Sequence, residues 1–245
     1  MKNLKKSLLL ILILVAPMMQ AQKKKVAVVT FYANKMVGFD ELGGGLDFLL
    51  GDIMNLRDDP NFNLNPLLEK YHTNFFNSYA KEFPFDLLPE TDVVDNEKYK
   101  AFVPKFEMSK YDAKNYLLYN KYKYIYEGIA GKHNEEEVAK IFAENADGVL
   151  FVEINFAFEK GFGIGNTMTI KMRAFTRIAL YNKKGEKVFV INENERSKKT
   201  GVMVGGVPVV KPEKILPMCE SALEELMGDL QKRIAKVVKK SEAKL

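Results

Sequence analysis

The 245-residue chain contains a single cysteine, Cys219, and this scarcity excludes a disulfide within the chain. The fold must therefore be held together by packing. Cys219 also lies far from the N-terminus, whereas a lipoprotein carries its acyl chains on a cysteine directly after its leader, so we expect no lipid anchor. We interpret Cys219 as a small buried apolar side chain; pairing with another chain and a reactive thiol are the alternatives.

The chain also has only two histidines, His72 and His133, and few serines. Neither histidine has a second His or Cys at the spacing of metal ligands, and no serine lies in a nucleophile elbow. We place His72 at a surface or half-buried helix position. The sequence therefore predicts no metal, no cofactor and no enzymatic activity. A hydrolase of envelope or extracellular polymers is the alternative, because its two acids can come from distant segments.

No apolar run approaches the about 20 residues that span a bilayer. The run from Leu8 to Ala16 follows a basic start, ends at Pro17 and leads to Ala21. Those parts are typical of a secretory signal peptide, so we expect residues 1–21 to be cleaved and the protein to be periplasmic or secreted. An uncleaved anchor is the alternative.

Neither positive nor negative charge is in large excess. The formal net charge is +5, and the predicted leader carries three of the lysines, so the remainder is nearly balanced. A strong basic footprint is missing, and we expect no nucleic acid partner. Residues 22–245 show no repeat or linker, which favours a single domain.

Apolar patterns predict strands and helices in the first half of the chain. Residues 26–31 are rich in β-branched side chains and indicate a strand buried on both faces. A short helix is expected over 46–56, and a second one from Asn65, its predicted cap, to the proline at 84. Residues 85–89 favour another strand.

Aromatic residues alternate further along, and a charged cap follows them. Tyr122, Tyr124 and Tyr126 alternate as on one face of a strand, and we favour packing in a sheet over stacking against sugars or peptides. A helix is predicted over 134–146, with Asn134 as its cap and three glutamates in its first turn.

The second half carries the strongest pattern. Two long segments, 150–159 and 168–180, alternate between apolar and polar residues, and a turn at 182–185 leads to a third strand over 187–192. A last helix over 212–240 has an apolar stripe that comprises Cys219, Leu223, Leu226, Leu230, Ile234 and Val237. The predicted fold class is α+β: a mixed sheet with an antiparallel C-terminal meander, helices packed on it and a long C-terminal helix.

Four segments in this order carry a family resemblance: 24–29, 85–89, 146–152 and 184–189. The chain resembles the α/β periplasmic domain shared by the curli secretion-channel lipoproteins, the penicillin-binding-protein activator lipoproteins and the amino-terminal domain of the Tol-Pal translocation protein. The resemblance implies a non-enzymatic domain that binds other envelope proteins. This chain lacks the acylated cysteine and clear channel-forming hairpins, so we expect no secretion pore, and no functional residue transfers.

Two glycine-rich connections, 161–166 and 200–210, are predicted to lie at the same end of the sheet. Loops usually expose polar residues, and these two contain apolar side chains that mark a candidate partner- or membrane-contacting patch: Phe162, Ile164, Met203, Val204 and Val207. The alternative is that they complete the core, or that 202–210 is a further strand. The lysines near the end of the last helix are interpreted as a solvated face rather than a lipid contact.

Together these patterns predict a secreted, non-enzymatic binding or assembly module of the bacterial cell envelope. We expect an envelope protein as its partner, with peripheral membrane contact and a structural homo-oligomer as alternatives. A pocket lined by two carboxylates about 5–9 Å apart would instead favour the hydrolase.

Overall fold

The computed structural model describes residues 23–39, 56–105, 114–125, 133–239 and 241–245. The predicted leader and all but the last residue of the predicted helix over 46–56 lie outside these residues, as does Tyr126. The side chain of Val237 lies outside the described part as well.

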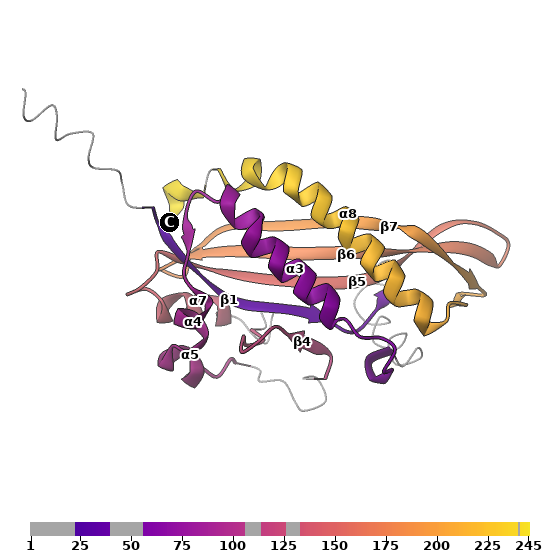
Figure 1. Ribbon diagram of the computed structural model, residues 1–245, viewed down its shortest axis with the longest axis horizontal. Helices are drawn as coiled ribbons and strands as arrows, with labels where there is room; N and C mark the ends of the chain where they lie inside the picture. The colour runs from indigo at the N-terminus through magenta and orange to yellow at the C-terminus, as the bar shows by residue number, and fades with distance from the viewer. Residues whose placement is uncertain (1–22, 40–55, 106–113, 126–132, 240) are drawn as a thin grey trace, which may run out of the picture.

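The centre of the molecule is one mixed, eight-stranded sheet, drawn across the middle of Figure 1. The main path runs in the order β3-β1-β5-β6-β7-β8; β2 pairs with β5, and β4 pairs with β1. β1 is parallel to β3 and β5, whereas β5 to β8 form an antiparallel meander. The predicted fold class is therefore confirmed. The strands are β1 (Lys25–Asn34), β2 (Gly38–Phe39), β3 (Asp86–Leu87), β4 (Tyr116–Leu118), β5 (Gly148–Ile164), β6 (Thr167–Asn182), β7 (Lys187–Val204) and β8 (Val207–Pro208).

β1 lies inside the sheet and is buried on both faces, as its run of β-branched residues predicted. The predicted strand over 85–89 is much shorter, because only Asp86 and Leu87 pair with β1. The chain turns into a helix directly after Pro89.

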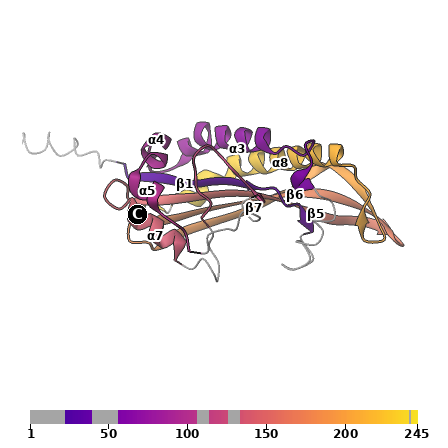
Figure 2. The ribbon, with the colours of Figure 1, turned by 90° about the horizontal axis from the view of Figure 1, so that it is seen from below.

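Two helices, α3 (Asn65–Asn77) and α8 (Pro212–Val238), cover one face of the sheet (Figure 2). α8 packs on β6 and β7, and its predicted stripe is buried from Cys219 to Ile234 and continues to Val238. Cys219 is fully buried, which confirms its interpretation as a packing residue. α7 (Asn134–Ile141) packs on the other face.

Both predicted helix caps are wrong by one position. Asn65 is already helical, and the side chain of Asn63 accepts its backbone N–H at 3.0 Å. His133, with a φ of 75°, precedes α7, while the buried Asn134 bonds the backbone of Lys105 instead of capping. Both helices also end early, at Asn77 and Ile141, and the first gives way to a 3₁₀ turn over Tyr79–Glu82. Further 3₁₀ turns span Leu56–Asp58 and Glu242–Lys244.

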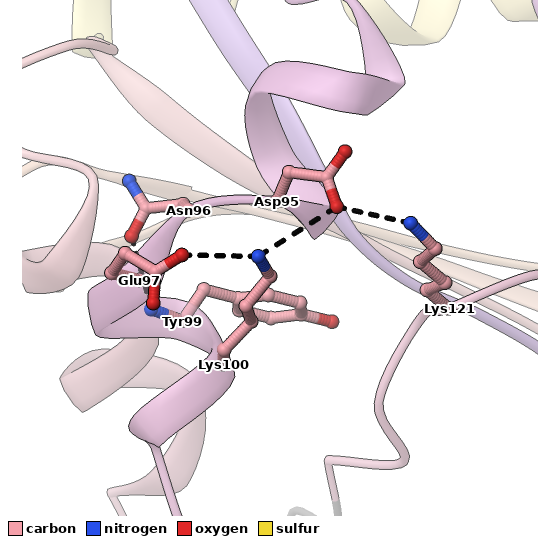
Figure 3. Close-up of polar contacts among 6 residues, drawn as sticks. All are labelled: Asp95, Asn96, Glu97, Tyr99, Lys100 and Lys121. Atoms are coloured by element: carbon pink, nitrogen blue, oxygen red, sulfur yellow. Dashed lines mark hydrogen bonds and ion pairs between the residues drawn. The ribbon is translucent and has the colours of Figure 1, made fainter.

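Two short helices, α4 (Glu90–Val94) and α5 (Glu97–Ala101), join at the polar cluster in Figure 3. Asn96 caps α5 by accepting the backbone N–H of Tyr99 at 3.0 Å. Lys100 and Lys121 both pair with Asp95, and the hydrogen bond from Lys121 leads the causes that lower the pKa of that carboxyl. The Tyr99 hydroxyl donates to the carbonyl of Val29 at 2.6 Å and so ties α5 to β1.

Tyr122 and Tyr124, the described members of the predicted row of tyrosines, do not lie in a strand. The strand in this region is β4, and residues 122–125 follow it without sheet pairing. Tyr122 is buried, and its hydroxyl donates to Glu90 at 2.8 Å. Packing in the interior, rather than sheet propensity, therefore explains this tyrosine.

The meander is longer than predicted. β5, β6 and β7 contain 17, 16 and 18 residues, and β7 runs to Val204 instead of ending near 192. Gly165, Gly205 and Gly206 adopt positive φ in the connections at the far end, where a side chain would be strained. The strands therefore form a narrow extension, which reaches past the start of α8 at the right of Figure 1.

Candidate functional site

Six large apolar side chains are exposed on the narrow extension. The exposed fraction is 80% for both Phe162 and Ile164, and 65% for Val209. Val202, Val204 and Val207 are exposed by 43–52%. We call these six residues the tip surface: Phe162, Ile164, Val202, Val204, Val207 and Val209. Elsewhere in the described chain, the other large apolar side chains of comparable exposure are Val103 and Leu118.

The exposure expected of Met203 is wrong, because this side chain is 1% exposed and belongs to the core. The cause is strand alternation. β7 continues through Met203, so this residue points to the opposite face from Val202 and Val204. Met203 pairs with Met168, which also packs against the core.

Strand register places the tip surface on one face of the extension. Ile164, Thr167, Val204 and Val207 are consecutive cross-strand partners, and paired residues point to the same face.

A second row lies two residues further back along the strands. Val202 pairs with Thr169 and accepts the backbone N–H of Val209 at 2.8 Å. Phe162 stands two residues before Ile164, and its carbonyl accepts the Thr169 hydroxyl at 3.0 Å. The two rows form one apolar face, in which Thr167 and Thr169 lie between the apolar side chains of the neighbouring strands.

A polar pocket of about 260 Å³ lies on the sheet face opposite α3 and α8, and sequence reasoning missed it. It is lined by Tyr32, Asn34, Tyr116, Tyr124, Ile125, Glu153, Asn155 and Arg177. These residues come from β1, β4, β5, β6 and the segment after β4, so no local motif joins them. Alternation of polar residues along β5 was the available signal, because Glu153 and Asn155 share its polar face.

Arg177 and Glu153 of this pocket both have hydrogen-bond partners within the protein. Arg177 donates two hydrogen bonds to Glu135 of α7, at 2.7 and 2.9 Å, and Tyr32 donates to Glu153. Burial raises the pKa of Glu153, and the positive charge of Arg177 opposes that shift. Among the described residues, Glu153 is the one carboxylate of the lining. This pocket therefore lacks the pair of lining acids that would favour the hydrolase. A second depression, of about 590 Å³, is lined by two acids, Asp92 and Glu144, and both of these residues are exposed.

His72 is buried rather than at a surface position, which corrects the prediction from the sequence. Its Nε2 lies 2.8 Å from a carboxylate oxygen of Glu90, and its ring stacks on Tyr119 at a centroid distance of 3.7 Å. Burial tends to raise the pKa of Glu90, and the hydrogen bonds from His72 and Tyr122 outweigh it and lower that pKa. This network ties α3 to α4 and to the segment after β4.

His133 pairs with Glu136 at 2.7 Å, on the exposed start of α7. In the part of the chain that the structure describes, no group of three His, Cys, Asp or Glu side chains is placed to hold a metal ion. The helices described there also include none long and apolar enough to cross a membrane.

The chain matches no protein-family model and no curated protein. Solved structures do match it at low similarity, among them the following three. A neuraminyllactose-binding hemagglutinin homolog from Helicobacter pylori has a TM-score of 0.40 and 8% identity, with 91% of each chain covered. Lipoprotein GNA1162 from Neisseria meningitidis has a TM-score of 0.26 and 13% identity, over 84% of this chain and 99% of that one. A minor lipoprotein from Acinetobacter baumannii has a TM-score of 0.26 and 8% identity, over 43% of this chain and 87% of that one. Likeness at this level assigns neither a family nor a function.

Proposed function

We propose that this protein is an exported, non-enzymatic binding module of the bacterial cell envelope, which attaches to another envelope component through the tip surface. The observation that carries the proposal is the exposure of six large apolar side chains on one face of the extension. Contiguous exposed apolar surface marks interaction sites, because a monomer gains nothing by holding it in water.

The position of the tip surface also supports its role as the attachment site. The extension reaches past the start of α8, so a partner reaches its end without meeting the helical layer. Met203 and Met168 anchor its other face in the core, which holds the exposed face in a fixed orientation. Export rests on the basic and apolar leader over residues 1–21.

Sedimentation with envelope membranes tests the proposal. We expect the exported, purified protein to sediment with membranes from its own source, and the double variant Phe162→Ser/Ile164→Ser to remain in the supernatant. Val103→Ser is the matched control, because Val103 is 64% exposed and lies outside the tip surface. Equal sedimentation of the wild type and the double variant would contradict the proposal, and so would cleavage of envelope polymers by the purified protein.

A further inference from the structure

The segments of the extension and the start of α8 contain more lysines than acids, and no part of the proposed function requires that excess. The two segments that build the extension and lead into α8, 160–171 and 199–214, contain five lysines and one acid, Glu213. The lysines are Lys160, Lys171, Lys199, Lys211 and Lys214. The chain as a whole has 37 basic and 32 acidic residues, so this excess is local.

Apolar and basic side chains line the same depression at this end. A surface depression beside the tip is lined by Pro208, Val209, Val210, Lys211 and Lys214. Lys211 and Lys214 are exposed in this depression, and Lys171 lies on the same face as the tip surface, because it follows Thr169 by two residues on β6. Lys160 points to the opposite face, since it pairs with the buried Ile170, and the charge of Lys199 acts on Glu224 of α8. Glu159 of β5 forms ion pairs with Arg196 and Arg173. The part of the sheet next to the extension therefore carries no net negative charge.

We propose that the tip surface docks on an anionic phospholipid bilayer, with its apolar rows in the interface and with Lys171, Lys211 and Lys214 on the lipid phosphates. This inference rests on the proposed function and names its partner. Apolar side chains flanked by Lys and Arg are the combination by which peripheral elements bind anionic membranes.

The dimensions of the tip surface fit a shallow insertion. Its two rows are two residues apart along the strands, which is about 7 Å. Interfacial elements bury their apolar faces to a depth of about 5–10 Å. Both rows therefore fit into the interface while the lysines behind them stay at the level of the headgroups.

A protein partner or a second copy fits these features less well. A stable protein interface uses about 20–30 residues on each side, whereas the tip surface has six. Two tip surfaces face to face would also bring both sets of lysines together, and like charges repel. A fluid, negatively charged surface has neither restriction.

Sedimentation with protein-free vesicles tests the inference. We expect the exported wild-type protein to bind phosphatidylglycerol vesicles, to bind phosphatidylcholine vesicles much more weakly, and to lose affinity as salt screens the lysines. Phe162→Ser/Ile164→Ser should weaken binding at least about tenfold, because both apolar side chains are removed. Lys211→Gln/Lys214→Gln should weaken it by about fivefold for each lysine.

Two controls and a folding measurement keep the outcomes distinct. Lys232→Gln/Lys236→Gln removes exposed cations from the far end of α8, and Val103→Ser removes an apolar side chain outside the tip. Both should bind as the wild type does, and all variants should unfold at the wild-type temperature, since every replaced side chain is exposed.

Failure of this inference is distinguishable from failure of the proposed function. Binding to envelope membranes without binding to pure lipid vesicles would overturn the lipid partner and leave the proposed function standing. Binding to neither would overturn both. Loss of vesicle binding in Lys232→Gln/Lys236→Gln but not in the tip variants would also overturn the inference, and so would a concentration-dependent dimer that the tip variants abolish.

Discussion

Replacement of Met203 and of Phe162 by alanine should have opposite consequences, although both residues lie in apolar, glycine-rich segments at the same end of the sheet. Met203 is 1% exposed and packs in the core, whereas Phe162 is 80% exposed. Removal of a buried methionine side chain costs about 2–5 kcal/mol, because apolar contacts are lost and a cavity remains. Removal of an exposed side chain changes stability by less than about 0.5 kcal/mol.

Equilibrium unfolding in urea measures both effects. We expect Met203→Ala to lower the free energy of unfolding by about 2–4 kcal/mol, with an unchanged denaturant slope, because the edge of the core is opened without a change of fold. Phe162→Ala should unfold with the wild-type midpoint. A Phe162→Ala variant that loses more than about 2 kcal/mol would show that the tip completes the core, and a neutral Met203→Ala would refute the strand alternation that separates the two residues.

Two further predictions concern the pocket on the opposite face. Glu135 is 1% exposed, and Glu135→Gln leaves Arg177 partly buried without its counter-charge, so this variant should lower the free energy of unfolding by about 3 kcal/mol. Glu136→Gln breaks the exposed pair with His133 and should lower it by less than about 1 kcal/mol in the same chemical denaturation assay. The raised pKa of Glu153 means that the folded state holds this proton more tightly than the unfolded chain, so wild-type stability is lost as pH rises from the ordinary Glu pKa through the folded one. Glu153→Gln should therefore unfold at a higher urea concentration than the wild type at neutral pH but not at acidic pH, and an equal difference at both pH values would contradict burial as the cause.

The strands and the last helix could be predicted from the sequence where one side of the pattern is consistently apolar. β1 is apolar throughout, and α8 repeats apolar residues at helical steps, so local and tertiary preferences agree. β7 was predicted too short, because polar residues occupy both of its faces between Asn192 and Thr200. Their pairing with β6 is set by the neighbouring strand and not by their own pattern.

The candidate site was predictable in part. The apolar segments at the end of the sheet were visible as residues that loops rarely contain, and Phe162, Ile164, Val204 and Val207 are exposed there. Met203 was misplaced because the inward side of an extended strand is known only once its register is known. The same limit applies to the polar pocket, whose residues meet only through long-range strand pairing. His72 was likewise misjudged, since Glu90 lies on a different helix.

The most direct measurement is the fraction of exported protein that sediments with envelope membranes, compared between the wild type, Phe162→Ser/Ile164→Ser and Val103→Ser. A binding module that acts through the tip surface predicts that the double variant stays in solution while Val103→Ser sediments with the wild type. If all three proteins sediment alike, or none of them sediments, the tip surface is not the attachment site.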